Sequence, residues 1–146
     1  MRKIFYFILL LAACKGEPNP RFKSVDDGLK KTLSTAQLSN TKNIILIPRA
    51  GCGGCIDNAI GYLKPRIDSL QQVEIIFTGI SDKKLLKLIV GEDFLKKKNV
   101  HIDSLNHFLE LKAMSVYPQI VSLEEGNVSD IKELDVESND MRKLLN

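Results

Sequence analysis

Short continuous apolar runs alternate along this chain with stretches in which apolar residues recur every three or four positions. Ile44–Ile47 and Val73–Thr78 are runs of the first kind, rich in β-branched residues, and such runs are typical of strands buried on both faces of a sheet. Two later runs, Ile120–Leu123 and Val128–Leu134, flank the polar segment Glu124–Asn127. This pattern predicts a β-hairpin.

Most of the remaining chain has helical spacing. The expected helices are about Asp26 to Leu38; Ile56 to Leu70, with a kink at Pro65; Asp82 to Val90, with Leu85, Leu86 and Ile89 facing inward; Ser104 to Lys112; and Val136 to Leu145. A short extended piece, Val100–Ile102, precedes the fourth of them. Strands that alternate with helices before a terminal hairpin predict an α/β fold, a central mixed β-sheet flanked by helices on both faces.

The chain begins with the pattern of a secretory signal peptide. Basic Arg2 and Lys3 precede the apolar run Ile4–Leu11, and two alanines lead to Cys14. The apolar run is shorter than the roughly 20 residues that span a bilayer. Leu11-Ala12-Ala13-Cys14 resembles the bacterial lipobox, in which cleavage precedes a lipid-modified cysteine. An ordinary signal peptide and a short buried helix remain the alternatives.

The expected division of the chain follows from this leader. Residues 1–13 are a lipoprotein signal peptide, residues 14–25 a lipidated tether that contains two prolines, and residues 26–146 one domain. The protein is then anchored to a membrane by lipid on Cys14, outside the cytoplasm. Lys15 stands where an Asp would favour inner-membrane retention in the best-known sorting rule, which favours a periplasmic or outer-membrane location.

Charge excludes one class of partner. The net charge is +3, and removal of Arg2 and Lys3 with the leader leaves 19 of the 21 basic side chains against 18 acidic ones. A nearly neutral domain offers no basic surface for nucleic acid, so we expect no nucleic-acid partner.

The candidate chemistry lies in Cys52 and Cys55. This CxxC pair follows a predicted strand and opens a predicted helix, where unpaired N–H groups and the helix dipole favour the thiolate of the first cysteine. Arg49 stands three residues upstream and adds positive charge. A passive structural disulfide is one alternative reading. Copper or zinc binding is another, but it needs further ligands, and His101 and His107 are far away in sequence, so we expect no metal site.

In this order of elements the sequence resembles the thioredoxin-like superfamily, most closely its membrane-tethered extracytoplasmic members. The matching features are the strand Ile44–Ile47, the CxxC at its end, the strand Val73–Thr78, and Tyr117-Pro118 before the hairpin. The resemblance implies that Cys52 is the nucleophile and Cys55 the more buried, resolving thiol. It also implies that Tyr117 and Pro118 contact substrate, with Pro118 cis and facing the cysteines.

Two positions depart from the family pattern. Gly51 replaces the usual aromatic residue before the first cysteine, and Ile44–Ile47 contains no buried acid. The expected function is a lipid-anchored thiol–disulfide oxidoreductase without a cofactor, whose partners are disulfide-containing or dithiol proteins. A thioredoxin-fold binding lipoprotein with an inert disulfide, and a metal chaperone, remain as rivals.

Overall fold

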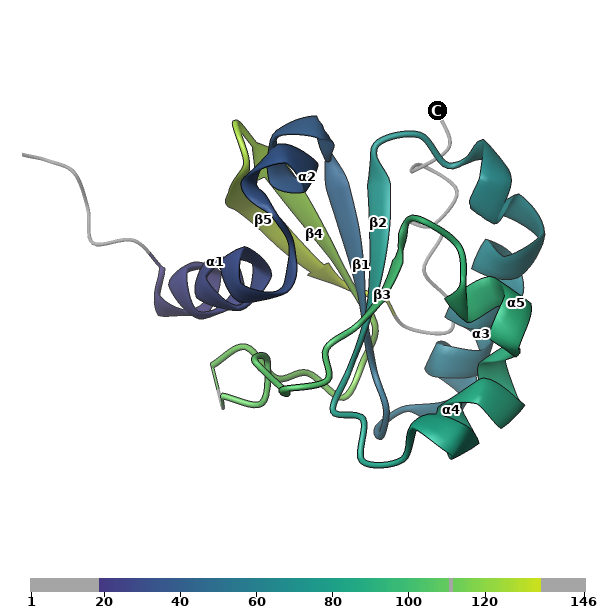
Figure 1. Ribbon diagram of the computed structural model, residues 1–146. Helices are drawn as coiled ribbons and strands as arrows, with labels where there is room; N and C mark the ends of the chain where they lie inside the picture. The colour runs from purple at the N-terminus through teal and green to yellow at the C-terminus, as the bar shows by residue number, and fades with distance from the viewer. Residues whose placement is uncertain (1–18, 111, 135–146) are drawn as a thin grey trace, which may run out of the picture.

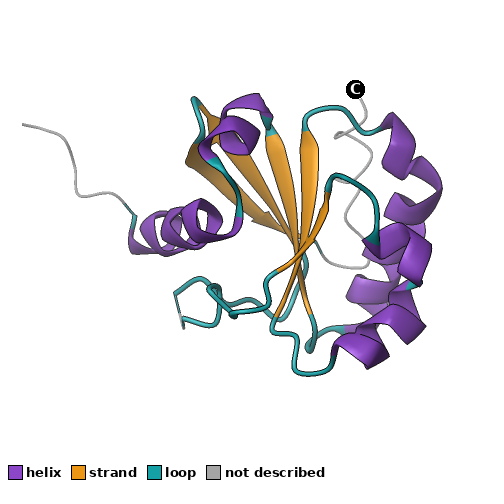
Figure 2. Ribbon diagram, viewed as in Figure 1, coloured by secondary structure: helices purple, strands orange, loops and turns teal. Residues whose placement is uncertain are grey.

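The computed structural model describes residues 19–110 and 112–134, which form a five-stranded mixed sheet with helices on both faces (Figures 1 and 2). The strands are β1 (Asn43–Pro48), β2 (Val73–Thr78), β3 (Val100–Ile102), β4 (Gln119–Glu124) and β5 (Asn127–Glu133), in the spatial order β3-β2-β1-β4-β5. The helices are α1 (Pro20–Thr32), α2 (Thr35–Asn40), α3 (Gly53–Leu63), α4 (Lys83–Val90) and α5 (Glu92–Leu95), with a 3₁₀ helix, η1 (Lys64–Ser69). This is an α/β, thioredoxin-like fold, as the sequence predicts.

Strand β1 is the centre of the sheet. It pairs in parallel with β2 and antiparallel with β4, so that Ile45 lies between Ile75 and Ile120. Its side chains alternate between two cores: Ile45 and Ile47 face α3, η1, α4 and α5, whereas Ile44 and Leu46 face α1 and α2. Coverage of both faces explains why this strand is a continuous apolar run.

The hairpin between β4 and β5 forms where the sequence predicts it. The two residues at its tip, Glu125 and Gly126, have φ values of 52° and 77°. Positive φ at both central positions is what the tight two-residue turns of hairpins require. The predicted kink is also present, since α3 ends at Leu63 and continues as the 3₁₀ helix that contains Pro65.

The first helix begins earlier than predicted. It starts at Pro20 rather than Asp26, because Asn19 accepts a hydrogen bond from the Arg21 N–H and Pro20 occupies the first turn. Val25, which the sequence places in the tether, is fully buried. The helix also breaks at Leu33, and a capping box between Ser34 and Gln37 starts α2.

The predicted helix Ser104–Lys112 is wrong, because its described residues form turns. Asp103, whose side chain is fully buried, holds this segment. Its Oδ2 accepts hydrogen bonds from the Thr78 hydroxyl (2.9 Å) and the Phe108 N–H (3.3 Å). Phe108 packs directly on Gly28 of α1, where a Cβ would lie 2.7 Å from its ring. These long-range contacts override the helical spacing of the segment.

Helix α4 differs from its prediction in the face that it buries. The helix begins where it was predicted, with Asp82 as its N-cap residue, and Leu86 is buried as predicted, but Leu85 and Ile89 are 40% and 48% exposed. The predicted helix Val136–Leu145, the leader and Cys14 lie outside the described residues. Among the described helices, none has the length and apolar character needed to cross a bilayer.

We expect Asp103→Ala to lower the free energy of unfolding by about 2–3 kcal/mol, because it leaves the buried Thr78 hydroxyl and Phe108 N–H without their acceptor. Urea denaturation measures this change. Asp68→Ala is the control, since Asp68 pairs with Lys97 at an exposed site and its loss should cost less than about 1 kcal/mol. Equal urea midpoints for the two variants would contradict the anchoring role of Asp103.

Candidate functional site

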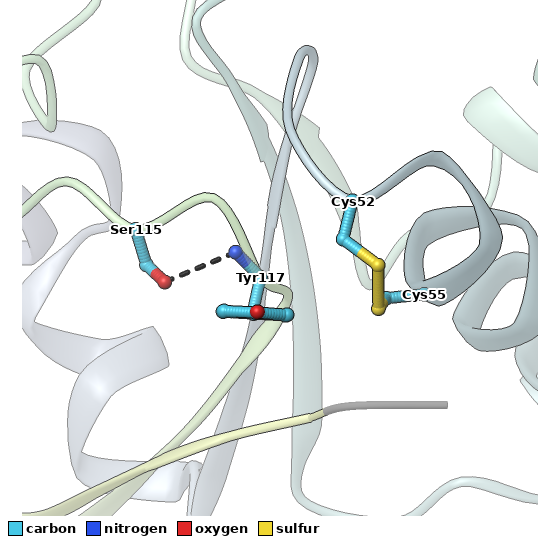
Figure 3. The surroundings of a disulfide bond; sticks show 4 residues. All are labelled: Cys52, Cys55, Ser115 and Tyr117. Atoms are coloured by element: carbon cyan, nitrogen blue, oxygen red, sulfur yellow. Dashed lines mark hydrogen bonds between the residues drawn. A yellow bond between two sulfur atoms is a disulfide. The ribbon is translucent and has the colours of Figure 1, made fainter. Parts of the chain in front are cut away.

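Cys52 and Cys55 lie at the start of α3 and are joined by a disulfide (Figure 3), with their Cα atoms 5.2 Å apart. Cys52 is half-buried, whereas Cys55 is 3% exposed. A Cβ on the intervening Gly53 would meet no heavy atom within 4 Å, so space is open beside the disulfide. An incoming group therefore reaches the sulfur of Cys52 more easily than that of Cys55, as the resemblance implies.

The position of Cys52 on its helix favours a negative charge. Cys52 is the N-cap residue of α3, and its carbonyl oxygen accepts the first helical hydrogen bond, from Ile56 (3.0 Å). The N–H groups of the first helical turn lack helical partners, and the positive end of the helix dipole lies there. After reduction of the disulfide, this environment stabilises a thiolate on Cys52.

The backbone of Val116 lies directly against the CxxC turn. The Cys52 N–H donates to the Val116 carbonyl oxygen over 2.8 Å. Gly51 has a φ of 148°, and a Cβ there would lie 2.1 Å from the same oxygen. The aromatic residue that the resemblance leads one to expect before the first cysteine is therefore excluded by this close approach, which only glycine allows.

Tyr117 and Pro118 follow Val116 and lead into β4. The hydrogen bond between Val116 and Cys52 therefore brings the loop with the predicted Tyr117-Pro118 pair close to the disulfide (Figure 3). Tyr117 is half-buried and its N–H donates to the Ser115 hydroxyl (3.0 Å), whereas Pro118 is buried. The predicted cis bond is wrong, because every peptide bond of the described residues is trans. The trans form is the one that X–Pro bonds intrinsically prefer. The hydrogen bond between this loop and Cys52 is accepted by the Val116 carbonyl, and Pro118 takes no part in it.

Arg49 and Asp57, the charged residues nearest to the cysteines in sequence, differ in how deeply they are buried. Arg49 is half-buried at the end of β1, where its N–H donates to the Thr78 carbonyl (2.9 Å). Asp57 of α3 is exposed and is not a buried proton acceptor. The buried carboxylate in the described part of the chain is Asp103, which directly follows β3 and is hydrogen-bonded to Thr78 at the end of β2. Sequence reasoning missed it because no local pattern marks it.

The two histidines pair with carboxylates instead of approaching the cysteines. His101 Nε2 lies 2.6 Å from Glu74 Oε2, and His107 Nδ1 lies 3.1 Å from Asp103 Oδ1. Within residues 19–110 and 112–134, no three His, Cys, Asp or Glu side chains gather closely enough to hold a metal ion.

Comparison with known proteins adds no family assignment: no protein-family model matches the chain, and no curated protein matches it in sequence. The fold and the disulfide-linked CxxC pair therefore carry the functional interpretation.

We expect Gly51→Ala to lower the free energy of unfolding of the oxidised protein by more than about 2 kcal/mol. The added methyl group would need both a strained φ and displacement of the Val116 carbonyl. Gly53→Ala is the matched control, since its Cβ would enter open space on a helix, and its effect should be within about 0.5–1 kcal/mol of zero. Chemical denaturation of both variants measures the difference, and similar stabilities would refute the close-packing argument.

Proposed function

We propose that this protein is an extracytoplasmic, lipid-anchored thiol–disulfide oxidoreductase that reduces or exchanges protein disulfides through Cys52 and Cys55. One observation carries the proposal: the pair lies at the N-terminus of α3 with Cys52 half-buried and Cys55 buried. A purely structural disulfide does not require this asymmetry, whereas an exchange reaction uses it.

In the reducing direction, the Cys52 thiolate attacks one sulfur of a substrate disulfide. A bond forms between Cys52 and that sulfur, and the second substrate sulfur leaves as a thiolate. The Cys55 thiolate then attacks Cys52, which forms the Cys52–Cys55 disulfide and releases the other substrate thiolate. The substrate gains two electrons, the pair loses two, and a dithiol protein partner restores the reduced pair.

The backbone around Val116 supports this assignment. Because the Val116 carbonyl is tied to Cys52, a polypeptide that reaches Cys52 also meets Val116 and Tyr117. Both side chains are available for contact, since Val116 is 55% exposed and Tyr117 is half-buried. We therefore propose Tyr117 and Val116 as substrate-contact residues, whereas the contact of the buried Pro118 with substrate stays a prediction from the resemblance alone.

The location belongs to the same proposal and rests on the sequence of the leader. The first described helix begins at Pro20, six residues after Cys14. Six residues span at most about 20 Å when fully extended. A lipid on Cys14 would therefore hold the domain close to the membrane surface and restrict its substrates to proteins found there.

The exchange reaction can be tested on the purified protein. In the reduced protein at neutral pH, iodoacetamide should alkylate Cys52 well before Cys55, and the pair should titrate at a potential above about −300 mV. Cys55→Ser should accumulate mixed disulfides with partner proteins, and Cys52→Ser, the control, should not. Slow and equal alkylation, a lower potential and no trapped partner would identify an inert structural disulfide.

The anchor can be tested separately in cells. An alkyne-tagged fatty acid should label the wild-type protein, and Cys14→Ser should abolish the label and release the protein from the membrane fraction. The Cys52→Ser variant is the matched control, since it removes a cysteine without removing the lipobox and should remain labelled. An unlabelled wild-type protein would contradict the lipid anchor.

A further inference from the structure

A small cavity lies beside the CxxC turn, on the face of the sheet that packs against α1. Its volume is about 140 Å³, and its walls come from the ends of β1 and β2, the start of β4 and the loop between β3 and β4. Ala50 and Tyr117 both line it; Ala50 directly precedes Gly51 of the CxxC turn, and Tyr117 directly follows Val116, whose carbonyl accepts the hydrogen bond from the Cys52 N–H. The cavity therefore adjoins the residues on both sides of the contact between the CxxC turn and the loop before β4.

A buried polar side chain lines this cavity, and its amide has no hydrogen-bond partner among the described residues. Gln119, the first residue of β4, is 1% exposed and lines the cavity. Among the described residues, neither its Oε1 nor its Nε2 has a hydrogen-bond partner. The Nε of Arg49, which lines the same cavity, is also buried without a partner. Buried amides are almost always satisfied, so this position calls for a ligand that both donates and accepts.

The rim of the cavity is apolar and exposed. Leu109 and Met114 line it and are 47% and 48% exposed, and Val116 beside them is 55% exposed. Exposed apolar side chains gathered around a hollow mark a place where a partner binds. The volume resembles that of a cavity that holds one benzene-sized group and is well below the roughly 300 Å³ of the smallest drug-sized pockets. One apolar side chain therefore fits the cavity.

We propose that this cavity seats an apolar side chain of an extended, disulfide-bonded polypeptide, while the Gln119 amide pairs with the adjoining backbone amide. A peptide group supplies both the N–H for Oε1 and the carbonyl oxygen for Nε2, which neither a carboxylate nor an ammonium group does. The inference rests on the proposed function and makes it more specific: preferred substrates carry a large apolar residue within a few positions of the reacting cysteine.

The test measures an equilibrium, so it does not depend on how fast the pair exchanges. The full chain with Cys14→Ser and Cys55→Ser keeps Cys52 as its one thiol. It is equilibrated with the symmetric disulfides and the corresponding thiols of two competing hexapeptides, which differ only in a Leu or a Ser near their cysteine, for each neighbouring position in turn. The Cys52 thiolate forms a mixed disulfide with one peptide of such a disulfide and releases the other as a thiolate. Mass spectrometry counts the two mixed disulfides. At one position the Leu peptide should be favoured about tenfold, as burial of most of one leucine side chain implies.

Substitutions in the protein test whether the preference for the Leu peptide arises at the cavity. Met114→Asp should reduce it to about twofold or less, because a carboxylate would stand at the apolar rim. Leu88→Asp is the matched control: Leu88 is 85% exposed on α4 and does not line the cavity, so the preference should remain. Methylation of one backbone nitrogen of the Leu peptide should lower its share several-fold with Gln119 present and leave it unchanged in Gln119→Leu.

The outcomes separate this inference from the proposed function. Equal occupancy by Leu and Ser peptides at every position, or a preference that Met114→Asp leaves intact, would overturn the cavity assignment even if the wild-type pair is exchange-active. A tenfold preference that Met114→Asp removes would support the cavity assignment even if the potential shows the wild-type pair to be inert. In that case the cavity would serve peptide binding alone.

Discussion

The hydrogen bond from the Cys52 N–H to the Val116 carbonyl joins two parts of the chain that are more than sixty residues apart, and the rest of the site depends on it. It requires the backbone of Val116 to pass within contact distance of Gly51, at a φ and a separation that a side chain would not tolerate. Through this contact the start of α3 and the loop before β4 become one surface. The disulfide, Tyr117 and the cavity then lie together because the backbone is fixed there.

The loop that carries Val116 is itself fixed at its other end by Asp103. This carboxylate ties the loop to Thr78 at the end of β2 and orients Phe108 into the core against Gly28. Asp103 and Gln119 are both buried polar residues at the same end of the sheet, but Asp103 has partners and Gln119 has none in the described structure. The first therefore holds the loop in place, whereas the second is the residue for which we propose a partner in the substrate.

The two sulfurs differ because the sheet and the helix place them differently. Cys55 is carried into the interface between α3 and the sheet by the same helical spacing that buries Ala59. Cys52, at the cap, stays at the surface beside open space. A two-step exchange reaction needs one sulfur that meets the substrate and one that meets only its neighbour. This helix start supplies both.

The sequence by itself determined the features that depend on neighbouring residues: β1 and β2 as continuous β-branched runs, the position of α4, the hairpin turn at Gly126, and the CxxC at a helix start. Only the tertiary structure decided that residues 104–110 form turns, that Gly51 lies against the Val116 carbonyl, and that Gln119 is buried at the cavity. Propensity and capping act within a few residues, so they can be recognised in a linear pattern. Thr78, which donates to Asp103, and Cys52, which donates to Val116, are distant from these residues in sequence, and a backbone contact between a glycine and a carbonyl oxygen leaves no periodicity to recognise.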